Sequence, residues 1–302
     1  AVVKPMIMRS IAVSLIICLS AGLQAQRLAH HDVLLLKISE NEGNWKVGDA
    51  SFLTSFNPEG YNNQPKFFSE NELWLTVQSD SDTTQTDIYA LNLSEKTVAA
   101  ITRTRRTAEY SPTLMPGGKR FSAVRVEEDG NQRLWSFPVN GENNGRPEFE
   151  SVYDVGYHCW INDTSAALFI VGHESEPHQL VIAGITEQEP KKIANNPGRC
   201  LLLKKDGQLT FVQKTTDQIW YLKQWSPVTN KQEIIVKMPS GSEDFAILPE
   251  GSFLTTQGAT LYVYSPGRDT DWKEAGNLGL YGVKKITRIA VSPGGKTAVV
   301  VE

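Results

Sequence analysis

Short apolar runs separated by turn residues recur along the chain, and six of them follow one pattern of strand, turn and strand. The pattern begins at Gln64, and the first residues of successive copies are 47, 46, 43, 44 and 44 positions apart. The six segments are QPKFFSENELWLTV (64–77), SPTLMPGGKRFSAV (111–124), YHCWINDTSAALFI (157–170), CLLLKKDGQLTFVQ (200–213), DFAILPEGSFLTTQ (244–257) and RIAVSPGGKTAVVV (288–301). Runs of this length bounded by turn signals are typical of β-strands, so the chain is predicted to be a tandem repeat of hairpins.

Each of the first five units continues with two more strand-like runs, such as residues 87–91 and 98–101 in the first unit. A period in the forties with four short strands per unit is the signature of a β-propeller, in which each unit forms one blade. The pattern therefore predicts an all-β fold, a six-bladed β-propeller that occupies residues 30–302.

The sixth unit has only two strands, 288–291 and 297–301, joined by a Pro-Gly-Gly turn. Two further strand-like runs, 32–38 and 45–53, precede the first unit and have no inner strands of their own. An isolated hairpin is marginally stable, and an open sheet edge invites aggregation. We therefore expect the N-terminal strands to complete the last blade and close the ring.

Two columns of the aligned units describe the strand expected to be innermost in each blade. The column two residues before the turn is large and apolar throughout: Phe67, Leu114, Trp160, Leu203, Ile247 and Val291. The column two residues earlier holds Pro65, Pro112, His158, Leu201, Phe245 and Ile289, in which only His158 is not apolar. This pattern predicts that both columns pack against neighbouring blades.

The second and sixth units, together with the run DIYALNL (87–93), resemble the WD40-like Tol repeat. That repeat has a Ser-Pro-x-x-Ser-Pro-Asp-Gly core followed by a small-apolar strand and an Ile-Tyr strand. Units three and four lack both prolines, and Gly294 stands where the repeat usually has Asp. The resemblance is to the TolB-like six-bladed propellers and covers roughly residues 32–302. It implies a scaffold for binding more strongly than any particular activity.

The first residues have the features of an export signal. Lys4 and Arg9 precede an apolar run over 11–19 and small residues up to Ala25, which is the order found in a secretory signal peptide. We predict a signal peptide over residues 1–25, with 1–5 as candidates for an upstream artefact, and a periplasmic or secreted mature protein. The apolar run is too short to span a bilayer, so no membrane insertion is expected after cleavage.

Charge and cysteine content narrow the classes of partner. The formal net charge is −4, and the basic cluster at 103–106 is short, so a nucleic-acid surface is not expected. Cys159 and Cys200 are the cysteines that follow the predicted signal peptide. They lie in different units and are expected to remain unpaired, since inner strands of neighbouring blades diverge around a channel.

The starts of the inner strands should surround one mouth of the central channel. Polar residues gather at these positions, and we take seven of them as candidates for ligand binding: Tyr110, Tyr157, His158, Arg199, Glu243, Asp244 and Arg288. Arg199 or Arg288 could hold an anionic group through a planar fork of donors. The alternative is that these side chains are merely solvated, and a lone histidine such as His158 is more often a core residue than a catalyst.

No catalytic residue, cofactor or metal is assigned from the sequence. At the expected mouth only Glu243 and Asp244 are acidic, and both belong to one unit, whereas a hard cation needs several oxygen ligands. The leading hypothesis is an exported, non-enzymatic binding or scaffold propeller that recognises a protein segment or a small polar ligand at the channel mouth. The alternatives are a propeller hydrolase, lyase or lactonase with His158 as acid/base, and a structural module of a periplasmic assembly.

Overall fold

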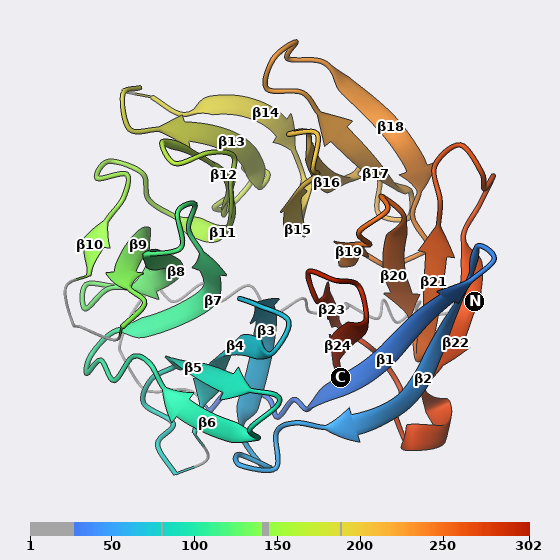
Figure 1. Ribbon diagram of the computed structural model, residues 1–302. Helices are drawn as coiled ribbons and strands as arrows, with labels where there is room; N and C mark the ends of the chain where they lie inside the picture. Colours follow the sequence, from blue (N-terminus) through green and yellow to red (C-terminus); the bar gives the residue numbers. More distant parts are fainter. Residues whose placement is uncertain (1–26, 80, 141–144, 188) are drawn as a thin grey trace, which may run out of the picture.

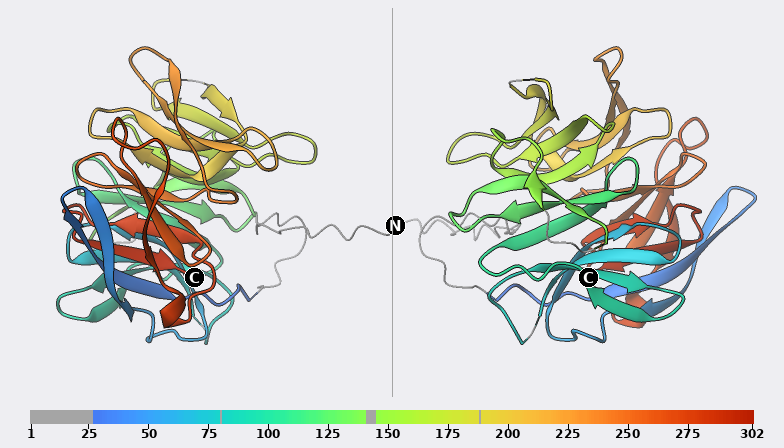
Figure 2. Two further views of the ribbon diagram at one scale, coloured as in Figure 1. Left: turned by 90° about the vertical axis from the view of Figure 1, so that its right-hand side faces the viewer. Right: turned by 60° about the vertical axis from the view of Figure 1, so that its left-hand side comes forward.

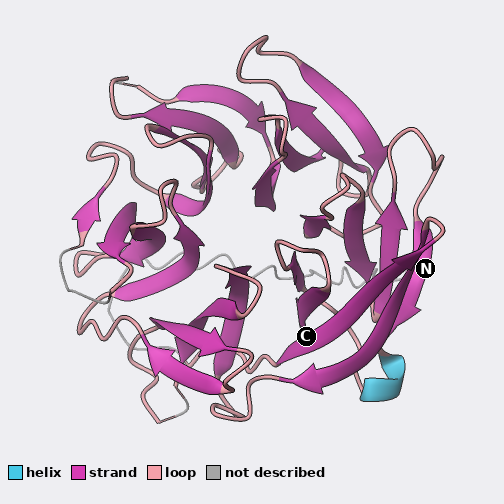
Figure 3. Cartoon of the chain, viewed as in Figure 1, coloured by secondary structure: helices cyan, strands magenta, loops and turns pink. Residues whose placement is uncertain are grey.

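Six four-stranded antiparallel sheets surround a central channel (Figure 1). The computed structural model describes residues 27–79, 81–140, 145–187 and 189–302. The predicted signal peptide, residues 1–25, lies outside this part of the chain. Within it the regular structure is almost entirely strand (Figure 3), apart from one 3-10 turn, η1 (Gly279–Tyr281). None of the described helical residues forms a segment long and apolar enough to cross a membrane.

Blades 1 to 5 are formed by consecutive strands, each with the earliest strand innermost. Blade 1 comprises β3 (Tyr61–Phe67), β4 (Glu72–Gln78), β5 (Asp87–Asn92) and β6 (Thr97–Ala100). Blade 2 comprises β7 (Ala108–Leu114), β8 (Arg120–Val126), β9 (Gln132–Pro138) and β10 (Arg146–Pro147). Blade 3 comprises β11 (Val155–Trp160), β12 (Ser165–Ile170), β13 (Gln179–Gly184) and β14 (Lys191–Asn195). Blade 4 comprises β15 (Pro197–Leu203), β16 (Leu209–Lys214), β17 (Trp220–Trp225) and β18 (Gln232–Lys237). Blade 5 comprises β19 (Phe245–Ile247), β20 (Phe253–Gln257), β21 (Thr260–Tyr264) and β22 (Lys273–Asn277).

Blade 6 joins the two ends of the described chain. Its sheet order is β2-β1-β24-β23, where β23 (Arg288–Val291) is innermost, followed by β24 (Thr297–Val301), β1 (Val33–Asn41) and β2 (Asn44–Phe52). The register places Val33 opposite Val301 and Leu36 opposite Ala298, and side views show β1 and β2 beside the C-terminal strands (Figure 2). The six-bladed all-β fold and the predicted closure of the ring are confirmed.

The turn that joins β23 to β24 has the geometry that its sequence predicts. Gly295 has φ +67°, and its N–H donates to the carbonyl of Ser292 over 2.9 Å. Gly118, in the corresponding turn of blade 2, has φ +68° and donates to Met115 over 3.0 Å. A positive φ costs glycine little, so the repeated glycine fixes the tight hairpin between the two inner strands of these blades.

Apolar packing between neighbouring blades holds the ring together. All six residues of the Pro65-to-Ile289 column are buried, as expected, including His158. In the column that ends the inner strands, Trp160 is buried, whereas Phe67 and Val291 are half-buried and line the channel. Each apolar cluster combines residues of two blades, as where Leu180 of β13 shares a core with Phe211 of β16. Burial of such side chains contributes about 1.5–3 kcal/mol each.

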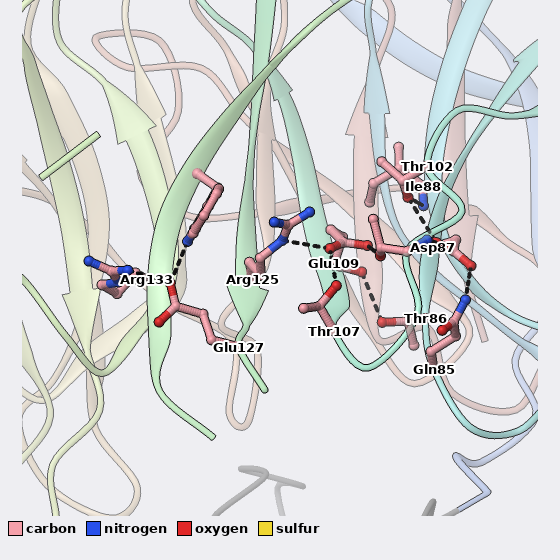
Figure 4. A network of polar contacts seen from close by, with 12 residues as sticks. Gln85, Thr86, Asp87, Ile88, Thr102, Thr107, Glu109, Arg125, Glu127 and Arg133 are labelled. Carbon is pink, nitrogen blue, oxygen red and sulfur yellow. Dashed lines mark hydrogen bonds and ion pairs between the residues drawn. The ribbon is translucent and has the colours of Figure 1, made fainter. Parts of the chain in front are cut away.

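A buried polar network links blades 1 and 2 (Figure 4). Glu109 of β7 is fully buried, and its carboxylate accepts hydrogen bonds from Arg125 over 2.8 Å, from Thr107 over 3.0 Å and from Thr104. The Thr86 hydroxyl of blade 1 donates to the Glu109 carbonyl over 2.9 Å. Burial raises the pKa of Glu109 despite the opposing charge of Arg125. Each acceptor is satisfied by a residue of this interface, which is the arrangement expected of a structural link.

Candidate functional site

The central channel contains a cavity of about 290 Å³. Residues from the innermost strands of all six blades line it: β3, β7, β11, β15, β19 and β23. This volume lies at the lower end of the range found for small-molecule sites. Five of the positions predicted from the repeat therefore surround one cavity in the channel.

Five of the seven candidate residues line this cavity, and two do not. Tyr157, His158, Arg199, Asp244 and Arg288 come from four blades and face the same space. The other two candidates, Tyr110 and Glu243, are not among the lining residues. Tyr110 packs against the apolar core shared by blades 2 and 3, and Glu243 is held by Lys214 over 2.8 Å.

Arg199 is paired with carboxylates and links three blades. Its Nε donates to Asp244 Oδ1 over 2.7 Å, one terminal nitrogen lies 3.8 Å from Glu243 Oε1, and another donates to the Thr287 carbonyl. Burial alone would lower the pKa of Arg199, but the charges of Asp244 and Glu243 outweigh it and raise the pKa. For the Glu243 carboxyl the directions are reversed: burial alone would raise its pKa, but the charges of Arg199 and Lys214 outweigh burial and lower the pKa. Arg199 thus fastens blades 4, 5 and 6 together.

The guanidinium of Arg288 contacts neutral groups. Its Nε donates to Asn63 Oδ1 over 3.0 Å, and a terminal nitrogen donates to the Tyr157 hydroxyl over 3.2 Å. The guanidinium carbon also lies 5.2 Å from the centre of the Tyr157 ring, a cation–π distance. No described carboxylate lies within 4.0 Å of this guanidinium. Arg288 is therefore held in position without being neutralised.

His158 lies in the wall of the channel and is not a solvated residue of its mouth. The side chain is 6% exposed, and Nε2 lies 2.7 Å from the Ser122 hydroxyl of β8. Burial lowers its pKa to about 3, with Lys66 as a second cause. The same Ser122 hydroxyl accepts a hydrogen bond from the Trp160 indole over 2.9 Å. His158 is thus a neutral core histidine with one satisfied ring nitrogen, and this corrects its expected place at the mouth.

Cys200 also lines the cavity, and its thiol donates to the Phe245 carbonyl over 3.2 Å. Burial raises its pKa to about 12, so the thiolate that would act as a nucleophile or metal ligand is disfavoured. Cys159 is buried, and both cysteines are free thiols, as expected. In the described residues no three His, Cys, Asp or Glu side chains are grouped as a metal site would require.

Sequence reasoning missed Lys66, a lysine that lines the cavity from β3. The signal was available in the aligned repeat. Lys66 occupies the third position of its unit, where the other units have only uncharged residues: Thr113, Cys159, Leu202, Ala246 and Ala290. The prediction took the first residue of each unit and the residue before it as the ones that face the channel. Lys66 was therefore passed over, although a charge in an otherwise uncharged column is informative.

Tyr61 and His31 lie near Arg288 and Arg199, although neither of them lines the cavity. Tyr61 opens β3, and burial raises its pKa, with the charges of Arg288 and Arg199 opposing that rise. His31 packs its ring edge-on against Tyr61, with the ring centres 5.6 Å apart, and its Nδ1 lies 2.8 Å from the Glu302 carbonyl.

The charges that line the cavity do not balance. Lys66, Arg199 and Arg288 are cationic, and Asp244 is the one described carboxylate among the lining residues. Since Asp244 is bonded to Arg199, the unmatched positive charge belongs to Lys66 and Arg288. Low-dielectric walls strengthen the field of such charges. The cavity therefore favours an anion, although the whole chain is acidic.

Comparisons with known proteins support the fold. No family model and no curated protein matches the chain. Among solved structures, a chain of a nidogen/laminin complex is 10% identical with a TM-score of 0.63, and the match covers 86% of this chain and 98% of that one. A putative TolB from Agrobacterium tumefaciens is 13% identical with a TM-score of 0.63, covering 90% and 97%. A puromycin hydrolase is 14% identical with a TM-score of 0.56, covering 88% of this chain and 48% of that one. The chain thus has the six-bladed β-propeller fold that it was expected to share with the TolB proteins.

Proposed function

We propose that this protein is an exported, non-enzymatic binding propeller that takes a small organic anion into its central channel. The observation that carries the proposal is Arg288. Of the five N–H donors of a guanidinium, two are used by Asn63 and Tyr157. The others have no partner among the described residues, although Arg288 faces the cavity.

A small ligand fits the cavity better than a protein segment does. The volume of about 290 Å³ is that of a small-molecule site. A carboxylate could form charge-assisted, bidentate hydrogen bonds with Arg288, and the Tyr157 ring beside it would pack against an apolar part of the ligand. The competing occupant is the carboxyl end of a peptide, and binding of such a peptide is one outcome of the test below.

The enzymatic alternative depended on His158 as acid/base, and its surroundings favour binding instead. A general base near neutral pH needs a pKa close to that pH and access to the substrate. His158 is 6% exposed with a pKa of about 3, and its neighbour Ser122 is fully buried. Although a serine and a histidine in contact resemble an activated nucleophile, neither side chain is open to a substrate here.

The proposal is tested by calorimetric titration of the purified protein at low ionic strength. The probes are acetate, hexanoate and citrate, each compared with its uncharged amide. We expect saturable binding of at least one acid and none of the amides. Arg288→Gln should weaken that binding about tenfold or more, because a charge-assisted pair is lost. Arg105→Gln, which removes an exposed charge outside the channel, is the matched control.

Two results would contradict the proposal. The first is a native protein that binds none of the acids, and the second is an Arg288→Gln variant that binds them as well as the native chain does. Binding of short peptides with a free carboxyl end, but of no small acid, would replace the small ligand with a protein segment. For the export part of the proposal, N-terminal sequencing of the mature protein should find that residues 1–25 have been removed.

A further inference from the structure

The second unmatched cation of the channel, Lys66, lies apart from Arg288. Its ammonium group has no hydrogen-bond or ion-pair partner among the described residues, and yet the side chain lines the cavity. Lys66 is in the third position of its repeat unit, whereas Arg288 is in the first position of its own. Because successive residues of a strand advance along its axis, the Lys66 position lies further along the channel from the strand starts than the Arg288 position does.

Two buried polar atoms in the same part of the wall also lack partners. They are the hydroxyl oxygen of Ser111 and the Nδ1 of His158, and both residues line the cavity. Buried polar groups without a partner cost free energy, and where a native structure keeps them they call for an explanation such as a ligand. With Lys66 they occupy the inner strands of three consecutive blades.

The hydrogen bonds around Ser122 indicate which ring nitrogen of His158 carries the proton. The Ser122 hydroxyl lies 2.7 Å from His158 Nε2 and 3.4 Å from the Thr113 carbonyl. The shorter contact is the better hydrogen bond, so Ser122 donates to Nε2 and the proton of the neutral ring resides on Nδ1. Nδ1 is therefore a donor, like the ammonium of Lys66, and both groups suit an anionic acceptor.

Backbone geometry adds a third feature of this wall. Gln64 and Ser111 have positive φ angles of 54° and 57°, which are uncommon for residues with a side chain. Each lies at a bulge of its inner strand. The Gln64 amide oxygen accepts hydrogen bonds from the Ser111 N–H over 2.9 Å and from Thr76 over 2.7 Å. Such strained positions concentrate at functional sites.

We propose that the channel binds a dianion, with one acidic group at Arg288 and the second at Lys66, beside the buried donors of Ser111 and His158. This inference rests on the proposed function and specifies the class of ligand. The two cationic positions would each take one carboxylate of a short linear dicarboxylate. Half-buried apolar side chains that line the cavity, such as Leu202 and Ala290, would contact its hydrocarbon part.

The experiment compares linear dicarboxylates, from succinate to sebacate, with monocarboxylates of equal length. Calorimetric titration of the full chain at low ionic strength measures both series. Affinity should rise to a maximum at one chain length. There the dicarboxylate should bind about tenfold to a hundredfold more tightly than its monocarboxylate, because a second charge-assisted hydrogen bond is formed.

Lys66→Gln should abolish that advantage while leaving the binding of monocarboxylates within about twofold of the native protein. Lys66→Arg keeps the charge and should retain most of the advantage. Lys46→Gln is the matched control, since it removes an exposed lysine from the outermost strand β2. Thermal melting of each variant verifies that the ring is intact.

Failures of the two proposals are distinguishable. If the native protein binds the two series equally and Lys66→Gln changes nothing, the dianion inference is wrong and the single-anion function stands. If Lys66→Gln weakens both series to the same extent, Lys66 belongs to the Arg288 position and the second position is refuted. If neither series binds to the native protein, the proposed function itself fails.

Discussion

Arg199 and Arg288 enter the same cavity from blades 4 and 6, yet their guanidinium groups meet opposite surroundings. Arg199 is bonded to Asp244, lies near Glu243 and donates to a carbonyl of a third blade. Among the described residues, Arg288 is held only by an amide oxygen, a phenol hydroxyl and an aromatic ring. The first arginine has its charge matched within the fold, whereas the charge of the second is left facing the channel.

This difference separates a structural charge from a binding charge. Removing one partner of a buried ion pair leaves the other charge uncompensated, which is strongly destabilising. Removing an unmatched cation leaves no such charge behind, and it relieves repulsion from its neighbours. Native proteins accept such unfavourable charges where function requires them. Replacement of Arg199 should therefore mainly reduce stability, whereas replacement of Arg288 should mainly reduce anion binding.

The largest effect is expected from Arg199→Ala. It leaves Asp244 and Glu243 without their shared cation at the junction of three blades, with Lys214 still bonded to Glu243. We expect the free energy of unfolding to fall by about 3 kcal/mol, as measured by urea denaturation. From the sequence alone Arg199 was a candidate for ligand binding, with a merely solvated side chain as the alternative. A loss below that of Arg105→Gln would show that the Arg199 pair contributes nothing to the ring.

The next effect concerns His158 and pH. Its folded pKa of about 3 lies below the ordinary value of 6.5, so the unfolded chain takes up the proton first. The stability from this group is complete above about pH 6.5 and is lost as the pH falls toward 3. Between these two pH values the free energy of unfolding falls by about 1.4 kcal/mol per pH unit because of this group.

The His158→Gln variant isolates this contribution. Its amide can still bond to Ser122 but does not titrate, so its stability should depend less steeply on pH between 6 and 4 than that of the native protein. Glu109, whose pKa is raised by burial, contributes with the opposite sign in both proteins and cancels in the comparison. Equal slopes in urea denaturation at pH 6, 5 and 4 would mean that His158 is protonated in the folded state.

A smaller change in stability is expected from Arg288→Gln. Its neutral partners Asn63 and Tyr157 can form other hydrogen bonds, so the free energy of unfolding should change by less than about 1 kcal/mol. The same variant should lose anion binding, which is the reverse of the expected result for Arg199. Urea denaturation and titration of one preparation measure both quantities. A loss of stability as large as that of Arg199→Ala would remove the distinction between the two arginines.

The smallest effect is expected from Lys66→Met. An unmatched ammonium in the channel is replaced by an apolar side chain of similar length, so stability should stay within about 0.5 kcal/mol of the native value or rise. Thermal and urea unfolding at low ionic strength are the measurements, because screening weakens the repulsion. A clear destabilisation would indicate that Lys66 has a structural partner.

The fold was predictable because its two determinants are both visible in the chain. The repeat period identified the blades, and the unpaired strands before the first unit identified the closure. The ends of outer strands were less visible: β1 continues to Asn41, beyond the expected residue 38. The last residues of β1 are polar and exposed. There the backbone pairing continues after the hydrophobic pattern has ended.

The site was only partly predictable. The repeat placed Tyr157, Arg199, Asp244 and Arg288 around one space, because equivalent positions of a closed ring must converge. It could not show that Arg199 is neutralised by Asp244, since that depends on the geometry between blades 4 and 5. For His158, the choice between the mouth and the core depended on the packing around Ser122 of the preceding blade.

The pairing of β1 with β24 has a consequence for the timing of folding. Paired residues of the two strands lie 260 to 268 positions apart in the sequence, from Lys37 with Thr297 to Val33 with Val301. At a synthesis rate of about 5–20 residues per second, β1 waits roughly 15–50 s before β24 exists. During that interval Val33, Leu34 and Leu36, which are fully buried in the finished ring, have no native strand to cover them. The last blade is thus the part of the molecule most exposed to mispairing with another nascent chain.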